Sequence, residues 1–302
     1  MAGTNMKAIK SRIKSVESTM SITKAMELVA SSKLRRAKMQ EEAVKPYYKL
    51  LAETIEDIIQ TTGEKNAFIR ETDVSSAACY IVIAGDRGLA GGYNANLFRL
   101  VRERIKEDDC ILPVGKKSVE HYEKQPYRIL TTDFRIAASV AIPEAHEIGD
   151  IICKHFLSGQ FGHVYLVYTE FKSMLTQEPQ LRALLPLDKD MMNPDASNAM
   201  AAREKENGFT KTEKITFHTD TLYEPSPEEV LSAIIPQYVS GMIYGAVCEA
   251  SASEFAARRT AMNAANKNAD EMISTLTLKY NRARQTMITQ EITEIIAGSN
   301  TL

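Results

Sequence analysis

The chain has 302 residues, of which 44% are hydrophobic and 25% are charged, and its formal net charge is −2. This composition is typical of a soluble globular protein, and the low aromatic content of 7% favours thin helical packing over a wide core. No apolar run approaches the roughly 18 residues needed to span a membrane, and the N-terminus has no apolar signal core. We therefore exclude a membrane-spanning or secreted protein and expect one that stays in the cytosol.

The positions of the charged residues and of the cysteines indicate what kind of partner and what kind of site to expect. Residues 1–40 contain nine Lys or Arg against two glutamates, which suggests an acidic partner for this end of the chain. The four cysteines lie more than 30 residues apart, and the five histidines fall in no ligand motif. We interpret the cysteines as buried small hydrophobic residues and predict no metal site.

Residues 6–62 are predicted to form one long helix. Ile9, Ile13, Val16 and Met20 recur at steps of three or four residues, which places them on one face, and the pattern continues less regularly towards Ala37. Pro46 is expected to kink this helix. At ~1.5 Å per residue the helix would be ~85 Å long.

The central part of the chain, from residue 77 to 187, changes to apolar runs that alternate with helical patterns. This alternation predicts βαβ units and a largely parallel sheet, hence a Rossmann-like α/β domain. The polar stretch 188–214 that follows is interpreted as a loop or linker. Strands are expected at 77–84, 110–114, 163–169 and 180–187, and helices at 95–106 and 143–157.

The last segment carries the most regular pattern in the sequence. Ser226 to Glu229 form a capping box with proline at the first helical position, and Gly298 is placed to end the helix. Between them, steps of three and four residues alternate without a break, which predicts a left-handed coiled coil. Pro236 is expected to bend this helix. The C-terminal heptad stripe consists of Leu231, Ile234, Tyr238, Gly241, Gly245, Cys248, Ala252, Phe255, Arg259, Met262, Asn266, Ala269, Ile273, Leu276, Tyr280, Ala283 and Met287.

Small and polar residues in this stripe require one specific partner helix. The only other long predicted helix lies at the opposite end of the chain. We therefore predict that the terminal helices pair antiparallel and flank the α/β domain. The expected segments are 1–62 for the first helix, 63–225 for the α/β domain, and 226–302 for the second helix.

The glycine-rich turn from Gly85 to Asn94 follows a predicted strand and precedes a helix, where a phosphate-binding loop would lie. Its spacing does not match GxGxxG, and no Gly-Lys-Ser/Thr follows, so we interpret it as a structural turn. No catalytic set stands out, and we predict no catalytic site and no cofactor. A nucleotide-dependent enzyme is the alternative, which ATP or NAD binding by the isolated chain would favour.

A basic cluster, Lys33, Arg35, Arg36 and Lys38, lies on the first helix and could contact nucleic acid. The apolar face of the same helix favours contact with protein, and no interleaved aromatic residues support base stacking. We therefore expect no nucleic-acid partner. A coiled-coil scaffold or nucleic-acid clamp is the second alternative, and tight, salt-dependent DNA binding would favour it.

Three blocks of the sequence resemble the gamma subunits of F-type ATP synthases and occur in that family's order. The first lies within 9–38 and is clearest at 22–34, ITKAMELVASSKL. The second is 86–94, DRGLAGGYN, and the third comprises 253–258, 280–285 and 288–295. The polar region 188–214 looks longer than the loop usual in the family.

The resemblance implies a non-catalytic rotor shaft. Its terminal helices would turn inside a ring of alpha and beta subunits, and its globular domain would contact epsilon and the membrane c-ring. Ion flow would drive the rotation and so couple to ATP synthesis or hydrolysis in the head. The residues that match the family's coupling contacts are Met26 with the basic residues Lys33, Arg35 and Arg36, and Arg258, Gln285, Thr289 and Glu291.

The N-terminus does not resemble a transit peptide, and the regulatory cysteine-pair insert of the chloroplast form has no counterpart, which favours a bacterial origin. We expect a peripheral protein on the cytoplasmic side of the cell membrane, without direct membrane insertion. We also hypothesise that the polar heptad stripe lets the shaft slip past its housing, because no deep apolar interface then holds it in one orientation.

Overall fold

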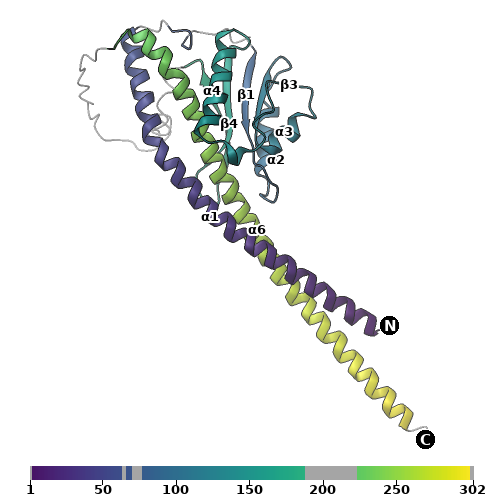
Figure 1. The fold of residues 1–302 in the computed structure, drawn as a ribbon. Helices are drawn as coiled ribbons and strands as arrows, with labels where there is room; N and C mark the ends of the chain where they lie inside the picture. The colour runs from purple at the N-terminus through teal and green to yellow at the C-terminus, as the bar shows by residue number, and fades with distance from the viewer. Residues whose placement is uncertain (1, 63–65, 70–76, 188–222, 300–302) are drawn as a thin grey trace, which may run out of the picture. The chain divides into compact units, whose positions relative to one another are not determined.

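The computed structural model describes residues 2–62, 66–69, 77–187 and 223–299, so the predicted loop 188–214 lies outside the described residues. Two long terminal helices accompany a five-stranded sheet and shorter helices (Figure 1). The elements are α1 (Ala2–Thr62), β1 (Ala78–Ile83), α2 (Tyr93–Arg102), β2 (Cys110–Val114), α3 (Lys116–Tyr122), β3 (Arg128–Ile129), η1 (Ala137–Ser139), α4 (Ile142–Leu157), β4 (His163–Phe171), β5 (Gln177–Leu185) and α6 (Pro227–Ser299).

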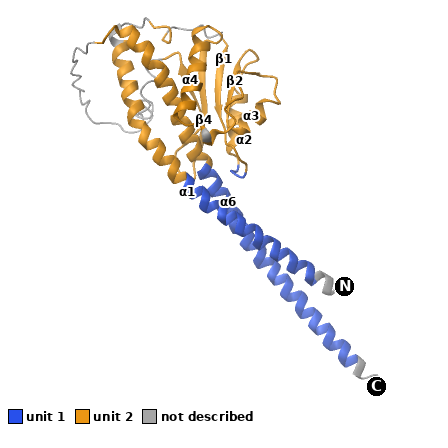
Figure 2. Cartoon of the chain, viewed as in Figure 1, with its two compact units in different colours: residues 1–33, 89–91, 255–302 blue, residues 34–88, 92–254 orange. Residues whose placement is uncertain are grey.

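The chain divides into two compact units (Figure 2). Unit 1 comprises residues 1–33, 89–91 and 255–302, and unit 2 comprises residues 34–88 and 92–254. Both long helices contribute residues to each unit. The units therefore cut across the three consecutive segments expected from the sequence.

The sheet of unit 2 has the strand order β3-β2-β1-β4-β5. The first four strands are parallel, and β5 runs antiparallel to β4 at the edge. The predicted largely parallel sheet with an edge strand is thus confirmed. The short elements α3 and β3 were not expected, because seven and two residues are too few to produce a recognisable period.

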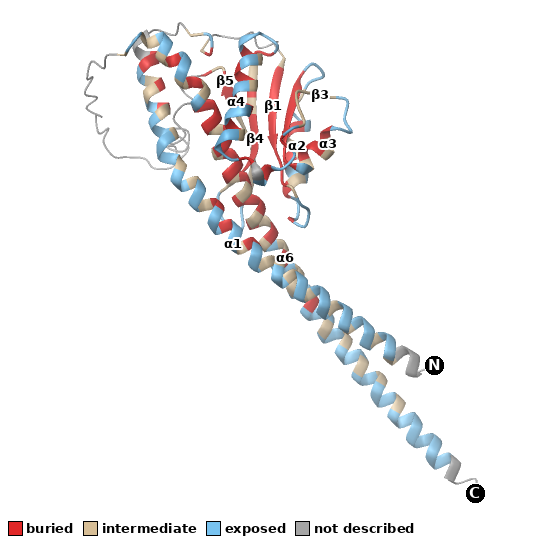
Figure 3. Ribbon diagram, in the orientation of Figure 1, coloured by how far each residue is buried: buried red, intermediate tan, exposed pale blue. Residues whose placement is uncertain are grey.

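Successive side chains of the central strand β1 point to opposite faces of the sheet, and each face has its own hydrophobic core. Cys79, Ile81 and Ile83 pack on the side of α4 and the long helices, whereas Tyr80 and Val82 pack on the side of α2 and α3. Both faces are covered, so β1 and β2 are buried throughout, whereas most of the edge strand β5 is half-buried (Figure 3). All four cysteines are buried free thiols, as the sequence predicted.

Within unit 2, α1 and α6 run antiparallel and in contact. Tyr47 Oη donates to Gln237 Oε1 at 3.3 Å, and farther along α1 the Tyr223 hydroxyl donates to Asp57 Oδ2 at 2.7 Å. A Cβ on Gly241 would lie 1.8 Å from the Tyr48 ring, so this glycine permits the close approach of the two helices. Both helices continue past the prolines at 46 and 236.

Two expectations for the C-terminal helix need correction. An 18-residue window within α6 is apolar enough to cross a membrane, which the sequence reading had excluded, but half of that window is buried inside the structure. Because Ile235, Val239 and Ile243 of α6 belong to the core of unit 2, packing against the sheet accounts for this composition. Gly298 lies within α6, which continues to Ser299, whereas the N-terminal cap is confirmed by Glu229 N–H donating to Ser226 Oγ at 3.2 Å.

Unit 1 is an antiparallel helix pair whose contacts follow the predicted heptads. Between residues 262 and 290 of α6, every described side chain that is at least half-buried belongs to the C-terminal heptad stripe, with the exception of Ala265. On α1, the half-buried side chains also recur at steps of three and four residues. The apolar residues alone showed this stripe only in part, because polar residues occupy two of its positions, Thr23 and Glu27. It consists of Met6, Ile9, Ile13, Val16, Met20, Thr23, Glu27 and Ala30.

Candidate functional site

A polar cluster joins α1 and α6 in the middle of unit 1. Thr23 Oγ1 donates to Asn266 Oδ1 at 2.5 Å, and Asn266 Nδ2 donates to Glu27 Oε2 at 2.9 Å. Asn263 Nδ2 adds a contact of 3.3 Å to Glu27 Oε1. These bonds fix which residues of the two helices face each other, since polar groups at heptad positions set register at a cost in stability.

The C-terminal heptad stripe therefore faces α1, so its polar residues are not the surface that would slip past a housing, as the hypothesis required. The outward surface of unit 1 carries large apolar side chains instead. On α1 these are Ile22, Leu28 and Val29, which are 56–67% exposed. Ile22 and Val29 lie seven residues apart, which places them on one face of α1.

The end of α6 extends past the start of α1 (Figure 1). Ala2 lies 21 residues before Thr23, so its counterpart in α6 lies about 21 residues after Asn266, near Met287. In agreement with this register, all side chains from Ile288 to Ala297 are exposed (Figure 3). This segment has no partner helix within the described part of the chain.

The exposed residues at this end of α6 form two sets, one apolar and one polar. One is apolar and consists of Ile288, Ile292, Ile295 and Ile296, which are 45–71% exposed. The other is a polar row formed by Arg282, Gln285, Thr286, Thr289, Gln290 and Thr293. The row includes two of the predicted contact residues, and Thr289 Oγ1 donates to the Gln285 carbonyl at 2.9 Å. Glu291 is also exposed but lies outside this row.

The basic residues predicted for subunit contacts fall into different environments. In unit 1, Lys33 Nζ lies 5.4 Å and Arg258 Cζ 5.8 Å from the centre of the Phe255 ring, which are cation–π distances. Arg258 is only 6% exposed, so it packs inside the unit rather than on its surface. Arg35 and Arg36 are exposed and belong to unit 2.

Met26 and Lys38 are not fully exposed, as residues of a contact surface would be. Met26 is half-buried beside the α1 stripe, which is neither a core position nor a fully exposed one. In unit 2, Lys38 Nζ lies 3.8 Å from the centre of the Phe171 ring, so this part of the basic cluster also packs within its own unit. The sequence pattern could not separate packed cations from exposed ones, because both occur at helical spacing.

The glycine-rich turn after β1 is held by carboxylates. Asp86 accepts backbone N–H bonds from Lys116 at 3.1 Å, Ala137 at 2.8 Å and Ala138 at 3.0 Å. The place beside Gly85 is filled by the Glu254 carboxylate, which a Cβ on that glycine would meet at 2.7 Å. Carboxylates of the chain itself therefore lie at this turn, and its interpretation as a structural turn stays a prediction.

Comparison with known proteins agrees with this geometry. A family model described as ATP synthase matches residues 5–302. A curated relative from Ruminococcus albus, named ATP synthase gamma chain, is 44% identical over 301 residues, which is 98% of each chain. The chain belongs to the ATP synthase gamma chain family. A second relative, from Acetobacterium woodii, is named ATP synthase gamma chain, sodium ion specific, and is 42% identical with 99% of both chains covered.

Solved structures support the fold assignment. A chain of the mitochondrial ATP synthase of Euglena gracilis, in an OSCP/F1/c-ring structure, aligns with a TM-score of 0.65 at 18% identity and covers 99% of this chain and 95% of that one. A chain of the central stalk/c-ring structure from Tetrahymena thermophila aligns with a TM-score of 0.54 at 20% identity, covering 81% of this chain and 99% of that one. These structures agree in fold, and the family model and the curated relatives confirm the family resemblance inferred from the sequence.

Proposed function

We propose that this gamma-family chain is the central rotor shaft of a membrane-bound ATP synthase. It transmits rotation driven by ion flow through a c-ring to a head of alpha and beta subunits, where ATP is made or hydrolysed. The observation that supports this role most directly is the exposure of apolar side chains at the end of α6. Its exposed isoleucines need an apolar partner, and a ring of surrounding subunits supplies one.

The register of unit 1 supports the transmission of torque. A shaft of two helices resists sliding when hydrogen bonds fix the facing residues, and Thr23, Glu27 and Asn266 form such bonds. Lys33 of α1, whose Nζ lies 5.4 Å from the centre of the Phe255 ring of α6, adds a second contact between the two helices. Rotation of one end would then be passed along the pair rather than lost as slippage between its helices.

We further propose which residues contact the head. Gln285, Thr289 and Glu291 are exposed near the end of α6 and face neighbouring subunits there, whereas Met26 contributes a half-buried contact on α1. Lys33, Arg35 and Arg36 provide the basic partner for acidic groups of the beta subunit. Arg258 acts differently, as a packed residue that positions Phe255 and Lys33.

We propose that unit 2 contacts epsilon and the c-ring, which makes the chain a peripheral protein on the cytoplasmic side of a bacterial membrane. It carries no catalytic group of its own in this assignment. Its complex moves protons, and a related gamma chain named as sodium ion specific makes sodium the competing ion. ATP-driven acidification of membrane vesicles that proceeds equally with and without sodium would support protons.

Reconstitution tests the proposed function. The purified chain should show no ATPase activity, whereas its addition to alpha and beta subunits from a close relative should raise their activity and yield a complex of defined stoichiometry. Turnover by the chain alone, or an alpha–beta mixture that neither binds the chain nor responds to it, would contradict the proposal.

A further inference from the structure

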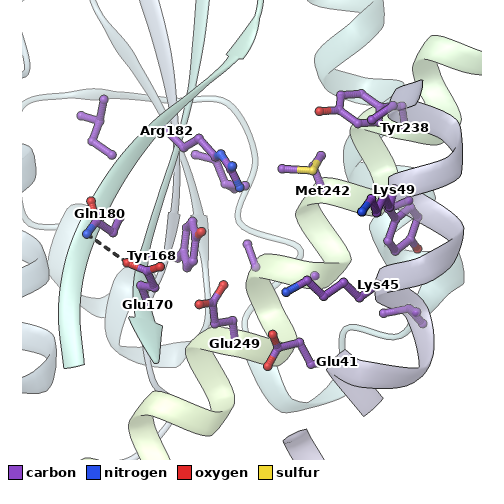
Figure 4. Close-up of a pocket in the computed structure, with 18 of the residues that line it drawn as sticks. Glu41, Lys45, Lys49, Tyr168, Glu170, Gln180, Arg182, Tyr238, Met242 and Glu249 are labelled. Atoms are coloured by element: carbon purple, nitrogen blue, oxygen red, sulfur yellow. Dashed lines mark hydrogen bonds between the residues drawn. The ribbon is translucent and has the colours of Figure 1, made fainter. Parts of the chain in front are cut away.

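Unit 2 contains a cavity of about 410 Å³ that the rotor function does not use. It lies between α1, the β4–β5 hairpin and α6 (Figure 4). Its volume falls within the range of small-molecule sites, roughly 300–1,000 Å³. The lining is mixed, with apolar residues of α6 on one side and charged residues from all three elements around them.

Two carboxylates from different helices share one end of this cavity. Figure 4 shows Glu41 of α1 and Glu249 of α6 extending into the same space, with Tyr168 of β4 nearby. Glu249 Oε1 accepts the backbone N–H of Phe171 at 3.2 Å, which holds its carboxyl group in place. In the described part of the chain, neither glutamate forms an ion pair.

The electrostatics of this end leave negative charge without full compensation. Burial raises the pKa of Glu249 to about 7, and the charges of Glu41 and Glu170 add to the rise, while Arg182 opposes it. Burial also raises the pKa of Glu41, although Lys45 and Lys38 act in the opposite direction. Of the other cations that line the cavity, Lys172 is paired with Glu178, and Lys49 lies farther along α1.

The apolar side of the cavity is kept open by a glycine. A Cβ on Gly245 would meet nothing within 4 Å, although the residue lines the cavity in the middle of a long helix. Glycine costs such a helix about 1 kcal/mol relative to alanine. Met242 and Ala246 flank the open space. By contrast, Gly241 is packed tightly against Tyr48, so the opening is local to Gly245.

We propose that this cavity binds a small organic cation, with a primary ammonium group between Glu41 and Glu249 and an apolar body over Gly245 and Met242. An ammonium group has three N–H donors and matches two acceptor-only carboxylates from opposite walls. Tyr168 lines the same end of the cavity. An anion of equal size would have to place its charge against two half-buried glutamates.

Proton release is a consequence of this arrangement. The cation binds the ionised form of Glu249, so binding displaces the proton that the raised pKa retains near pH 7. Affinity should therefore fall as the pH drops below 7 and level off above about pH 8. The other charged or titratable groups that line the site are Glu41, Lys45, Tyr48, Lys49, Glu53 and Glu56 on α1, Tyr168, Glu170 and Lys172 on or just after β4, Arg182 on β5, and Tyr238 on α6.

The test uses three probes of one shape, 4-phenylbutylamine, 4-phenylbutanol and 4-phenylbutyrate, with the purified full-length chain. Calorimetry at pH 7 and 8, in buffers with different ionisation enthalpies, should detect binding of the amine with proton release and much weaker binding of the other two. Glu249→Gln should weaken amine binding about tenfold or more and abolish the proton release. Glu42→Gln is the matched control, because this exposed neighbour of Glu41 does not line the cavity.

Gly245→Leu provides a second test, since the added side chain should fill the cavity while removing a helix-weakening glycine. The variant should keep the circular dichroism spectrum and melting temperature of the wild type or exceed them, and yet lose the amine. Equal binding of all three probes, or amine binding that survives both Gly245→Leu and Glu249→Gln, would overturn the proposal. Amine binding that is seen with the isolated chain and lost in the assembled complex would also overturn the proposal. In that case a basic side chain of a neighbouring subunit would occupy the cavity in the complex.

Discussion

Removal of the Asn266 side chain should loosen the helix pair of unit 1 at one defined place. Asn266→Ala deletes the bonds to Thr23 Oγ1 and Glu27 Oε2 and leaves the Glu27 carboxylate with the 3.3 Å contact to Asn263. A neutral hydrogen bond contributes about 1 kcal/mol and one to a charged group about 1.5–3 kcal/mol. Because the cluster is only half-buried, we expect a loss of about 2 kcal/mol in local stability.

Hydrogen exchange of the purified chain measures this loss where it occurs. Backbone amides near Thr23 and Asn266 should exchange about 30-fold faster in the variant, which corresponds to ~2 kcal/mol. Asn268→Ala is the control, since Asn268 is exposed and lies outside the heptad stripe. In a double-mutant cycle, Glu27→Ala and Asn266→Ala should be coupled by about 1 kcal/mol. Strictly additive effects, or equal exchange in the Asn268 and Asn266 variants, would refute the register argument.

Three further changes test the contact surface and the cavity. The first change replaces three exposed residues near the end of α6 with alanine: Gln285, Thr289 and Glu291. It should lower ATP synthesis in vesicles more than it lowers the amount of assembled complex. Unchanged synthesis would remove these residues from the coupling surface. Met26→Lys should leave assembly and ATP hydrolysis largely intact and weaken ion pumping, because a charge-assisted contact worth ~1–3 kcal/mol must break at each rotary step; a variant that fails to fold would make Met26 a core residue. Glu249→Gln should stabilise the chain progressively as the pH rises from 4.5 to about 7, by at most about 3 kcal/mol, because the folded state raises the pKa of this carboxyl and therefore loses stability on its ionisation. Urea titrations of the purified chain at pH 5 and 8 measure the difference, and an equal effect at both pH values would contradict the cause assigned to the shift.

The sequence by itself determined the elements whose period repeats many times. The C-terminal heptad stripe was found in full because each step of three or four residues is an independent sign of the same face, and burial follows that stripe from Met262 to Met287. The parallel strands β1, β2 and β4 were found because they are covered on both faces along most of their length, which requires unbroken apolar runs such as 79–83. The family followed from three motifs in order.

Tertiary structure alone decided which polar residues meet. Thr23 and Glu27 interrupt the apolar period of α1, so the sequence placed them outside its stripe, and only the antiparallel register brings them to Asn266. Arg258 has the spacing of a surface cation, yet packing around Phe255 buries it. Glu41 and Glu249 lie 208 positions apart in the chain, and their carboxyl groups share one cavity because two helices and a hairpin meet there. A local pattern cannot encode such meetings, since they depend on how separate elements dock.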